Sequence, residues 1–496
     1  MVNHGVSRGC ETCRARRKKC DEARPTCTRC AKAGRVCLGY RSYVDLQFRH
    51  YKGPTTYPSP SASPSGVTDN AVAIFLEEYS VSPTDPCISR GFLSGLPALL
   101  ADAEPSSDLV CATEIVAWTS LANQTSNDDL KVKARQQYIS VLHSFQGWLF
   151  SCQVHAPTAE ALAIAILLGL YEIISGSDET GQQQQHHLPH VRGVCALLLT
   201  ENSPFDLRSS TRLFQVANPL LTKDGFQNPE ASGVLCAPSS SDAIHSLDAI
   251  LIQCHPLFEC AEKQLRDLST PLDQIYSTLR HAIDVQQAFD HWELNIDASW
   301  CPETIGFIGD SDAKASSCPL TVSGPMHSYF DIYVAAVMNT YRKTHLMVLD
   351  IVIRLAERRN RDEPIVHWID VRACRHEASQ KIDEIAASVP YHLVKDLDEY
   401  MRVAISHEGA PTRGRAVGGL LLLHPLYVLS TCSVVPLATQ EYARKCLGWI
   451  GQKMGIGQAT VMSRGDQRIP FWEMAEGHVL IWAGMLIQSH ASPGDT

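Results

Sequence analysis

The stretch from residue 10 to residue 37 reads CETCRARRKKCDEARPTCTRCAKAGRVC and contains six cysteines in a regular pattern. The unit C-x2-C-x6-C occurs twice, and its cysteines are Cys10, Cys13, Cys20, Cys27, Cys30 and Cys37. A Cys-x2-Cys pair can place two thiolates on one metal ion, and structural zinc prefers four ligands in a closed tetrahedron. Two such sites need eight ligands. Six cysteines therefore predict a binuclear zinc cluster in which two sulfurs are shared.

A disulfide framework is the alternative interpretation of this cysteine pattern. Disulfides persist in oxidising compartments, and residues 1–30 lack the apolar stretch of about 7–15 residues that marks a secretory signal. The remaining twelve cysteines are scattered along the chain and include no Cys-x2-Cys pair. We therefore interpret the six N-terminal cysteines as metal ligands rather than as disulfide partners.

The segment between the second and third cysteines is strongly basic. Its cations are Arg14, Arg16, Arg17, Lys18 and Lys19. Residues 1–52 carry a formal charge of +9, whereas the rest of the chain carries −19. Cations concentrated in one small module gain binding free energy by releasing counterions from a phosphate backbone. The sequence predicts double-stranded DNA as the partner of this module, and a nuclear-import signal or a solvated basic surface is the alternative.

With these residues, the sequence resembles the Zn2Cys6 binuclear cluster of fungal transcription factors over residues 8–40. The resemblance implies two zinc ions per chain, bridged by Cys10 and Cys27. It implies that the remaining four cysteines divide into two pairs, one for each zinc ion: Cys13 with Cys20, and Cys30 with Cys37. The resemblance also implies that the first helix points into the major groove of DNA.

The same resemblance implies how DNA is read. In the family, the basic residues after the second cysteine contact bases and phosphates, which here are Arg14, Arg16, Arg17, Lys18 and Lys19. An arginine fork can bond O6 and N7 of guanine together, which agrees with the CGG-type triplets that the family reads. The implied function is a nuclear, zinc-dependent regulator of RNA polymerase II transcription that acts with the transcription machinery or co-regulators.

The composition of the chain changes after the cysteine cluster, where a linker precedes the large domain. Residues 53–66 contain four prolines, four serines and two glycines, so we expect a solvated linker over residues 41–70. Residues 38–80 show no sustained heptad pattern. A leucine-zipper dimer is therefore not predicted. The chain binds DNA either as a monomer or as a homodimer or heterodimer formed through its large domain.

An all-α domain is predicted over residues 71–490, and the resemblance to the family implies that this domain is regulatory. Apolar residues recur at helical spacing in a long segment from about residue 326 to residue 359, and the apolar runs 161–171 and 416–429 indicate buried helices. The gaps 175–187, 222–243 and 301–324 are rich in polar and turn-forming residues, so we expect loops there. The apolar runs are shorter than the ~18 residues that a membrane-spanning helix needs.

The sequence also bears on other functions, namely an enzyme, a protein-binding or ligand-sensing regulator and an activation segment. The G-x-S-x-G, Walker A and H-E-x-x-H motifs are absent, so an enzyme is not predicted. A protein-binding or ligand-sensing regulator, whose helical domain does the main work, stays open. Residues 284–300 place Phe289, Trp292 and Trp300 among acids, which is typical either of an activation segment or of a helix that buries its aromatic face.

Overall fold

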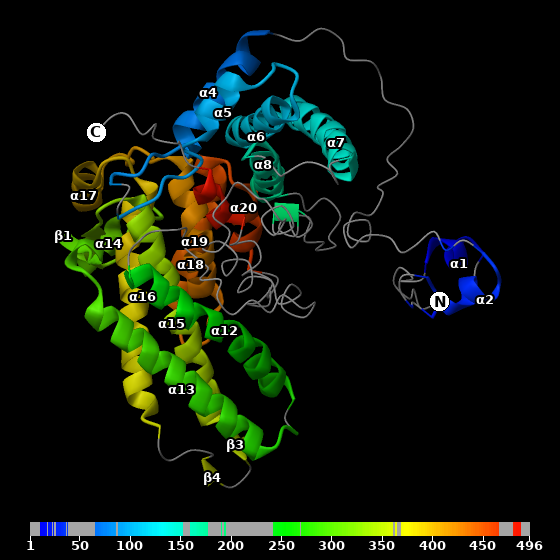
Figure 1. Ribbon diagram of the computed structural model, residues 1–496. Helices are drawn as coiled ribbons and strands as arrows, with labels where there is room; N and C mark the ends of the chain where they lie inside the picture. Colours follow the sequence, from blue (N-terminus) through cyan, green and yellow to red (C-terminus); the bar gives the residue numbers. More distant parts are fainter. Residues whose placement is uncertain are drawn as a thin grey trace. The chain divides into compact units, whose positions relative to one another are not determined.

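The computed structural model divides into two compact units, Met1–Ser63 and Pro64–Thr496. The structure describes residues 10–16, 18–21, 23, 26–35, 37, 65–85, 88–151, 159–176, 190, 193–194, 242–267, 269–360, 363–364, 369–465 and 480–487. Each unit is described below by itself (Figure 1).

The first unit contains two one-turn helices, one in each copy of the cysteine repeat. Helix α1 spans Glu11–Ala15 and helix α2 spans Thr28–Lys32. Helices this short are not stable in water by themselves, because one turn does not repay the cost of nucleation. Their buried contacts are made by cysteines, so the fold of this unit depends on its sulfur atoms.

The second unit is built mainly from α-helices. Its longer helices are α4 (Ser65–Tyr79), α6 (Asp108–Thr125), α7 (Asp128–Ser151), α8 (Ala159–Ser175), α12 (Asp242–Arg266), α13 (Leu272–Asn295), α15 (Ile332–Glu357), α16 (Val371–Leu393), α17 (Leu397–Ser406), α18 (Ala416–Thr431) and α19 (Leu437–Met454). Shorter elements are α5 (Leu96–Asp102), α14 (Asp310–Ala315), α20 (Gly457–Ser463), η1 (Ala298–Trp300) and η2 (Gly484–Leu486). The predicted architecture, a small cluster domain with a large helical domain, is confirmed.

Helix α15 forms the centre of the second unit. It packs against α16, α13, α12 and α18 (Figure 1). Almost all of its side chains are buried. The predicted helical segment began at residue 326, but residues 324–328 form a strand and α15 begins only at Ile332. Asp331 is the N-cap of α15, since its carboxylate accepts a hydrogen bond from the backbone N–H of Val334, at 3.0 Å.

The two apolar runs at 161–171 and 416–429 lie in buried helices, as predicted. They belong to α8 and α18, and nearly every side chain of both helices is buried. Helix α18 approaches α16 closely at Gly418, where a Cβ atom would lie 1.9 Å from the carbonyl oxygen of His392. Only glycine permits this close crossing of the two helices.

The prediction of a loop over 301–324 was wrong. Strand β1 (Glu303–Ile308) pairs antiparallel with β2 (Gly324–Ser328), and α14 lies between them. A second small sheet pairs β3 (Arg359–Asn360) with β4 (Glu363–Pro364). Most side chains of β1 are exposed, so the strand lacks the alternation of apolar residues that marks a strand in sequence. The other predicted gaps, 175–187 and 222–243, lie almost entirely outside the described residues.

Helix α4 begins at Ser65, so its first residues fall inside the stretch that we assigned to the linker. Glu78 joins this helix to the rest of the second unit. One carboxylate oxygen of Glu78 accepts hydrogen bonds from Arg413 at 2.8 Å and from the backbone N–H of Ala416, the first residue of α18, at 2.7 Å. A carboxylate at a helix N-terminus satisfies a free N–H group and the positive end of the helix dipole.

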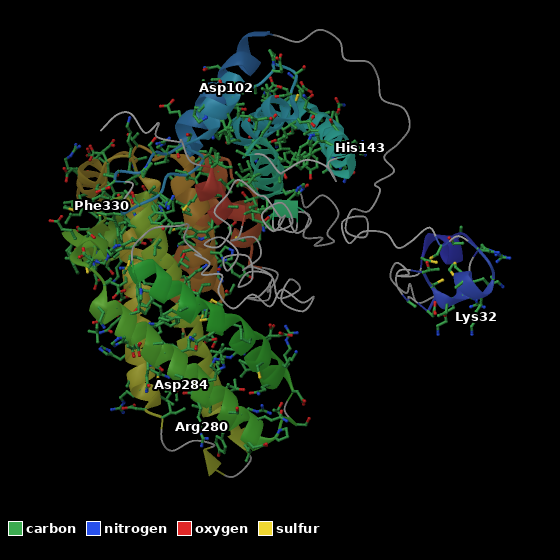
Figure 2. The ribbon with its side chains drawn as sticks, in the orientation of Figure 1. Lys32, Asp102, His143, Arg280, Asp284 and Phe330 are labelled. Atoms are coloured by element: carbon green, nitrogen blue, oxygen red, sulfur yellow. The ribbon has the colours of Figure 1, made fainter. Side chains whose placement is uncertain are left out.

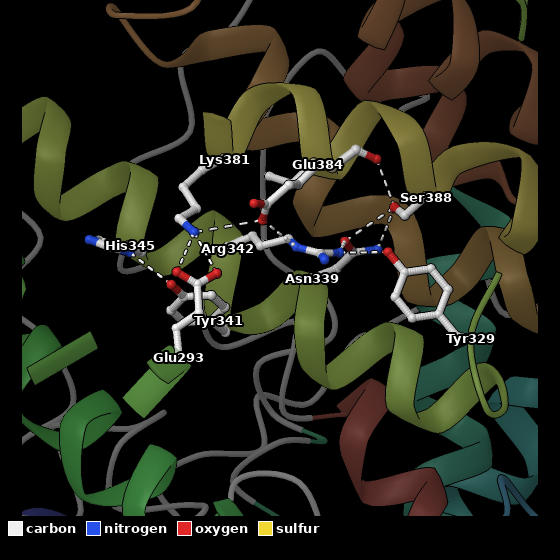
Figure 3. A network of polar contacts seen from close by, with 10 residues as sticks. Glu293, Tyr329, Asn339, Tyr341, Arg342, His345, Lys381, Glu384 and Ser388 are labelled. Atoms are coloured by element: carbon white, nitrogen blue, oxygen red, sulfur yellow. Dashed lines mark hydrogen bonds and ion pairs between the residues drawn. The ribbon is translucent and has the colours of Figure 1, made fainter. Parts of the chain in front are cut away.

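Charged side chains inside the second unit are paired across helix interfaces. The Arg342 side chain on α15 is 1% exposed, and it donates to Glu384 at 2.9 Å and to the Tyr329 hydroxyl at 2.6 Å. Lys381 donates to both carboxylate oxygens of Glu293 at 2.6 and 2.8 Å (Figure 3). An unpaired charge in such a place is costly. These contacts therefore fix α13, α15 and α16 relative to one another.

The acidic aromatic segment at residues 284–300 belongs to the core. Phe289, Trp292 and Trp300 are all buried, the first two on α13 and the third in η1. The sequence left open an activation segment or a buried aromatic face. These aromatic side chains are buried in the core. Within the described part of the chain, the helices are too short or too polar to cross a lipid bilayer.

Candidate metal centre and nucleic-acid interface

Two of the cysteines begin the short helices of the first unit. Cys27 is the N-cap of α2, and its sulfur accepts a hydrogen bond from the backbone N–H of Cys30 at 3.3 Å. Cys10 immediately precedes α1, and its sulfur accepts from the N–H of Cys13 at 3.4 Å. The two halves therefore repeat the same local geometry. A sulfur at a helix N-terminus is stabilised as a thiolate, because N–H groups and the helix dipole face it.

The sulfur atoms form two groups of four. The members of each group lie within 4.8 Å of one another: Cys10, Cys13, Cys20 and Cys27 form one group, and Cys10, Cys27, Cys30 and Cys37 form the other. Both groups contain Cys10 and Cys27, whose sulfurs are 3.7 Å apart. Six cysteines thus supply eight ligand positions when two sulfurs are shared, which is the count that two tetrahedral zinc ions require.

The distances between sulfurs fit zinc. A tetrahedral site with zinc–sulfur bonds of about 2.3 Å has edges of about 3.8 Å. The Cys10–Cys30 and Cys13–Cys27 sulfur distances are 3.8 and 3.7 Å. Cys13 and Cys30, which belong to different groups, approach to 3.9 Å. The sulfurs therefore form one compact cluster instead of two separate sites.

Binding of zinc to these thiols is linked to the loss of their protons. Burial raises the pKa of Cys27 to about 12 and raises the pKa of Cys10 well above its usual range. The same cause, desolvation, raises the pKa of Cys13. A zinc ion removes these protons and stabilises the thiolates, so binding of the metal and release of protons are linked.

The structure places three of the predicted DNA-binding cations on the surface of the first unit. Arg16, Lys18 and Lys19 are exposed, between the buried Cys13 and the partly buried Cys20. Arg14 lies on α1, and Arg17 falls outside the described residues. The backbone N–H of Lys18 bonds the carbonyl oxygen of Cys13 at 3.0 Å, which closes the chain back after α1. The basic segment is thus attached at both ends to the cysteine cluster.

Two residues that the sequence analysis did not single out join the two halves of this unit. Arg29 on α2 donates to the carbonyl oxygen of Lys19 at 2.8 Å. Asp21 accepts from the backbone N–H of Thr28 at 3.1 Å and from its hydroxyl. Both contacts connect the end of the basic segment after α1 to α2. No spacing in the sequence signals them, because each joins residues from different copies of the repeat.

The second repeat carries a different surface. Cations among its exposed residues are Arg29 and Lys32 on α2 and Arg35 after it (Figure 2 labels Lys32). At the positions between its second and third cysteines it reads AKAGRV, with two cations, where the first repeat reads RARRKK, with five. Positive charge is therefore concentrated on the first half of a nearly symmetric unit.

The chain is similar to known fungal regulators. Residues 8–44 match the family described as fungal Zn(2)-Cys(6) binuclear cluster domain. The transcription factor dbaG of Emericella nidulans is 31% identical over 432 residues, which cover 86% of this chain and 99% of that protein.

Two further relatives match shorter stretches. The aspercryptin biosynthesis cluster-specific transcription regulator atnN of Emericella nidulans is 36% identical over 83 residues, or 17% of this chain and 12% of the relative. The sorbicillinoid biosynthetic cluster transcription factor sor3 of Hypocrea jecorina is 33% identical over 105 residues, or 18% and 16%. No solved structure matches the chain.

The similarity to dbaG covers most of the chain, and the family match falls on the cysteine cluster itself. The domain with this family's pattern binds two zinc ions, in agreement with two overlapping groups of four sulfurs. The chain therefore belongs to the fungal zinc binuclear cluster transcription factors.

Proposed function

We propose that this protein is a nuclear regulator of RNA polymerase II transcription that reads CGG-type triplets in the major groove. One observation carries the proposal: an exposed basic segment is held at both ends by a cluster of sulfurs that fits two zinc ions. A flexible basic tail can bind phosphates, but reading a base edge requires a side chain at a fixed position. The cluster supplies that fixed position.

The zinc ligands follow from the two sulfur groups. Cys10 and Cys27 belong to both groups and bridge the two ions, as the resemblance to the family implied. Cys13 and Cys20 complete one tetrahedron, and Cys30 and Cys37 complete the other. The chain's own residues then do two things: the cysteines hold α1 and α2 together, and Arg14, Arg16, Arg17, Lys18 and Lys19 face the DNA.

A gel-shift experiment with the full-length protein tests the proposal. Duplexes containing a CGG triplet are compared with duplexes in which the triplet is scrambled, with and without a zinc chelator. We expect tight binding to the CGG duplex that disappears with the chelator and returns with zinc. Binding of the same strength with and without the chelator would contradict the role of the cluster. Equal binding to both duplexes would contradict recognition of the CGG triplet.

The oligomeric state during DNA binding is part of the same proposal. Since residues 38–80 lack a heptad pattern, a dimer would have to form through the helices of the second unit, which we call the helical body. Sedimentation of the protein with a single-triplet duplex and with a two-triplet duplex distinguishes a monomer from such a dimer.

The names of the relatives suggest a class of target. Two of them regulate biosynthetic gene clusters by their names. We infer that this protein also regulates genes of a biosynthetic cluster. Genome-wide mapping of its binding sites tests this, and sites spread over unrelated genes with no cluster among them would contradict it.

A further inference from the structure

A second group of metal-ligating side chains lies in the helical body, apart from the cysteine cluster. It consists of Asp290 on α13, His345 on α15 and Glu377 on α16, and one donor atom of each lies within 4.8 Å of the others. The His345 side chain is completely buried, whereas those of Asp290 and Glu377 are 44% and 21% exposed. Three helices thus bring one imidazole nitrogen and two carboxylates together at the edge of the core.

Nε2 of His345 faces both carboxylates and lies at ion-pair distance from them. Nε2 of His345 lies 2.8 Å from a carboxylate oxygen of Glu377 and 3.7 Å from one of Asp290. Despite this proximity, neither Nε2 of His345 nor that Glu377 oxygen makes a hydrogen bond of normal geometry. A buried polar atom without a hydrogen bond is costly. A divalent cation that takes both atoms as ligands would satisfy them.

Neighbouring residues hold both ligating groups in place. The other carboxylate oxygen of Glu377 accepts a hydrogen bond from the side-chain amide of Gln286 at 2.7 Å. Nδ1 of His345 lies 3.3 Å from the Tyr341 hydroxyl, and the His345 ring stacks on Phe289 with centroids 5.1 Å apart. Metal ligands in proteins are usually oriented by outer contacts of this kind, and a partner at Nδ1 leaves Nε2 directed at the ion.

The electrostatics of the group also favour a cation. The ammonium of Lys381 is bound by both carboxylate oxygens of Glu293 and acts on Asp290 only as a nearby charge. Partial burial and the adjacent Glu377 raise the pKa of Asp290 to about 7. Two carboxylates that crowd each other in this way are both stabilised as anions when a divalent ion lies between them.

We propose that Asp290, His345 and Glu377 bind one divalent transition-metal ion of the zinc class, separate from the two ions of the cysteine cluster. Imidazole nitrogen with carboxylate oxygen is a donor set that suits zinc and its first-row neighbours. Three protein ligands leave a fourth position open, and the exposed side of Asp290 gives water access to it. The ion links α13, α15 and α16, so it stabilises the centre of the body.

The metal content of the full-length protein tests this proposal. The protein is equilibrated with zinc at a buffered micromolar concentration, unbound metal is removed by gel filtration, and zinc is measured by mass spectrometry. We expect three zinc ions per chain in the wild type and two in Asp290→Asn and Glu377→Gln. Added zinc should also raise the melting temperature of the body in the wild type and leave it unchanged in both variants.

Asp284→Asn is the matched control, because Asp284 is an exposed carboxylate on the same helix α13 (Figure 2). This variant should keep three zinc ions and the full increase in melting temperature. Two ions in the wild type, or three in both ligand variants, would overturn the proposal. If Glu377→Gln does not fold, the half-exposed Asp290→Asn still decides the question. DNA binding depends on the other two ions, so failure here leaves the proposed function unaffected.

Discussion

The cluster domain and the helical body are stabilised by different interactions. In the described part of the first unit, the buried side chains are those of Cys10, Cys13, Cys27 and Cys30, with Cys20 and Cys37 packed against them. The body instead has one continuous apolar core that extends from Ala71 to Ile487. A unit as small as the first cannot bury enough apolar surface to fold alone, so metal–sulfur bonds replace the core. The body needs no such bonds to bury its helices.

Because of this difference, we expect zinc loss to affect the first unit and changes in core packing to affect the body. Loss of zinc from the cluster should remove DNA binding without melting the body. Repacking of the body should lower its stability without altering how the cluster contacts DNA.

Cys27→Ala should have the largest effect, because Cys27 belongs to both sulfur groups. Its loss removes a ligand from each zinc ion, and structural zinc contributes about 10–16 kcal/mol to the folding of small zinc domains. We expect loss of the two cluster zinc ions and of DNA binding, measured by mass spectrometry and gel shift, with an unchanged thermal melt of the body. Cys301→Ala, at an exposed cysteine outside the cluster, is the control. Retention of DNA binding by Cys27→Ala would refute its bridging role.

Glu384→Ala should destabilise the body by about 3 kcal/mol, since removing one partner of a buried ion pair leaves the other uncompensated. The partner here is Arg342, which keeps only the Tyr329 hydroxyl and a long contact to Asn339. Urea unfolding measures the change. Glu441→Ala removes an exposed partner of Lys445 and should cost less than about 1 kcal/mol. Equal effects of the two substitutions would show that the buried network contributes little.

Gly418→Ala should cost about 1–3 kcal/mol, because the new methyl group would meet the His392 carbonyl oxygen and push α18 away from α16. Gly448→Ala on α19 is the matched control. Its Cβ would lie 3.8 Å from Ser463, and alanine favours a helix by up to about 1 kcal/mol over glycine. Opposite signs of the two changes in urea unfolding are the expected result. A neutral Gly418→Ala would mean that the helices can separate freely.

Arg17→Ala should weaken binding to a CGG duplex by about 1–3 kcal/mol and relax the preference for that triplet, if its guanidinium bonds guanine through two N–H groups. Lys32→Ala, in the less basic second repeat, should leave the preference unchanged. Competition gel shifts with single-base variants of the triplet measure both effects. A uniform loss on all sequences would instead assign Arg17 to a phosphate contact.

The smallest effect is expected from pH, because the Asp290 side chain is 44% exposed and solvent screens its charge. The pKa of Asp290 is about 7 in the folded body and near 3.8 when unfolded, so the folded state binds more protons between these values. Without added zinc, the contribution of Asp290 to the unfolding free energy should therefore fall as the pH rises from about 4 to 7. Asp290→Asn should remove this part of the pH dependence, as urea unfolding at several pH values would show. An identical pH profile in the variant would assign the dependence to other groups.

Local patterns in the sequence predicted the cluster well. All six cysteines fall within one short stretch, and the structure brings their sulfurs into two groups that share Cys10 and Cys27. The apolar runs of α8 and α18 likewise predicted buried helices. Strand β1 was missed, because its exposed side chains give no periodic signal.

The sequence by itself determined that this protein binds zinc and carries a basic module suited to DNA. These properties depend on ligands and charges that are neighbours along the chain, where spacing alone limits what they can reach. The tertiary structure alone decided which buried groups meet in the body. Asp290, His345 and Glu377 come from three separate helices, and so do Glu293, Arg342 and Glu384. Such contacts depend on how helices pack, and packing is set by the shapes of many side chains together.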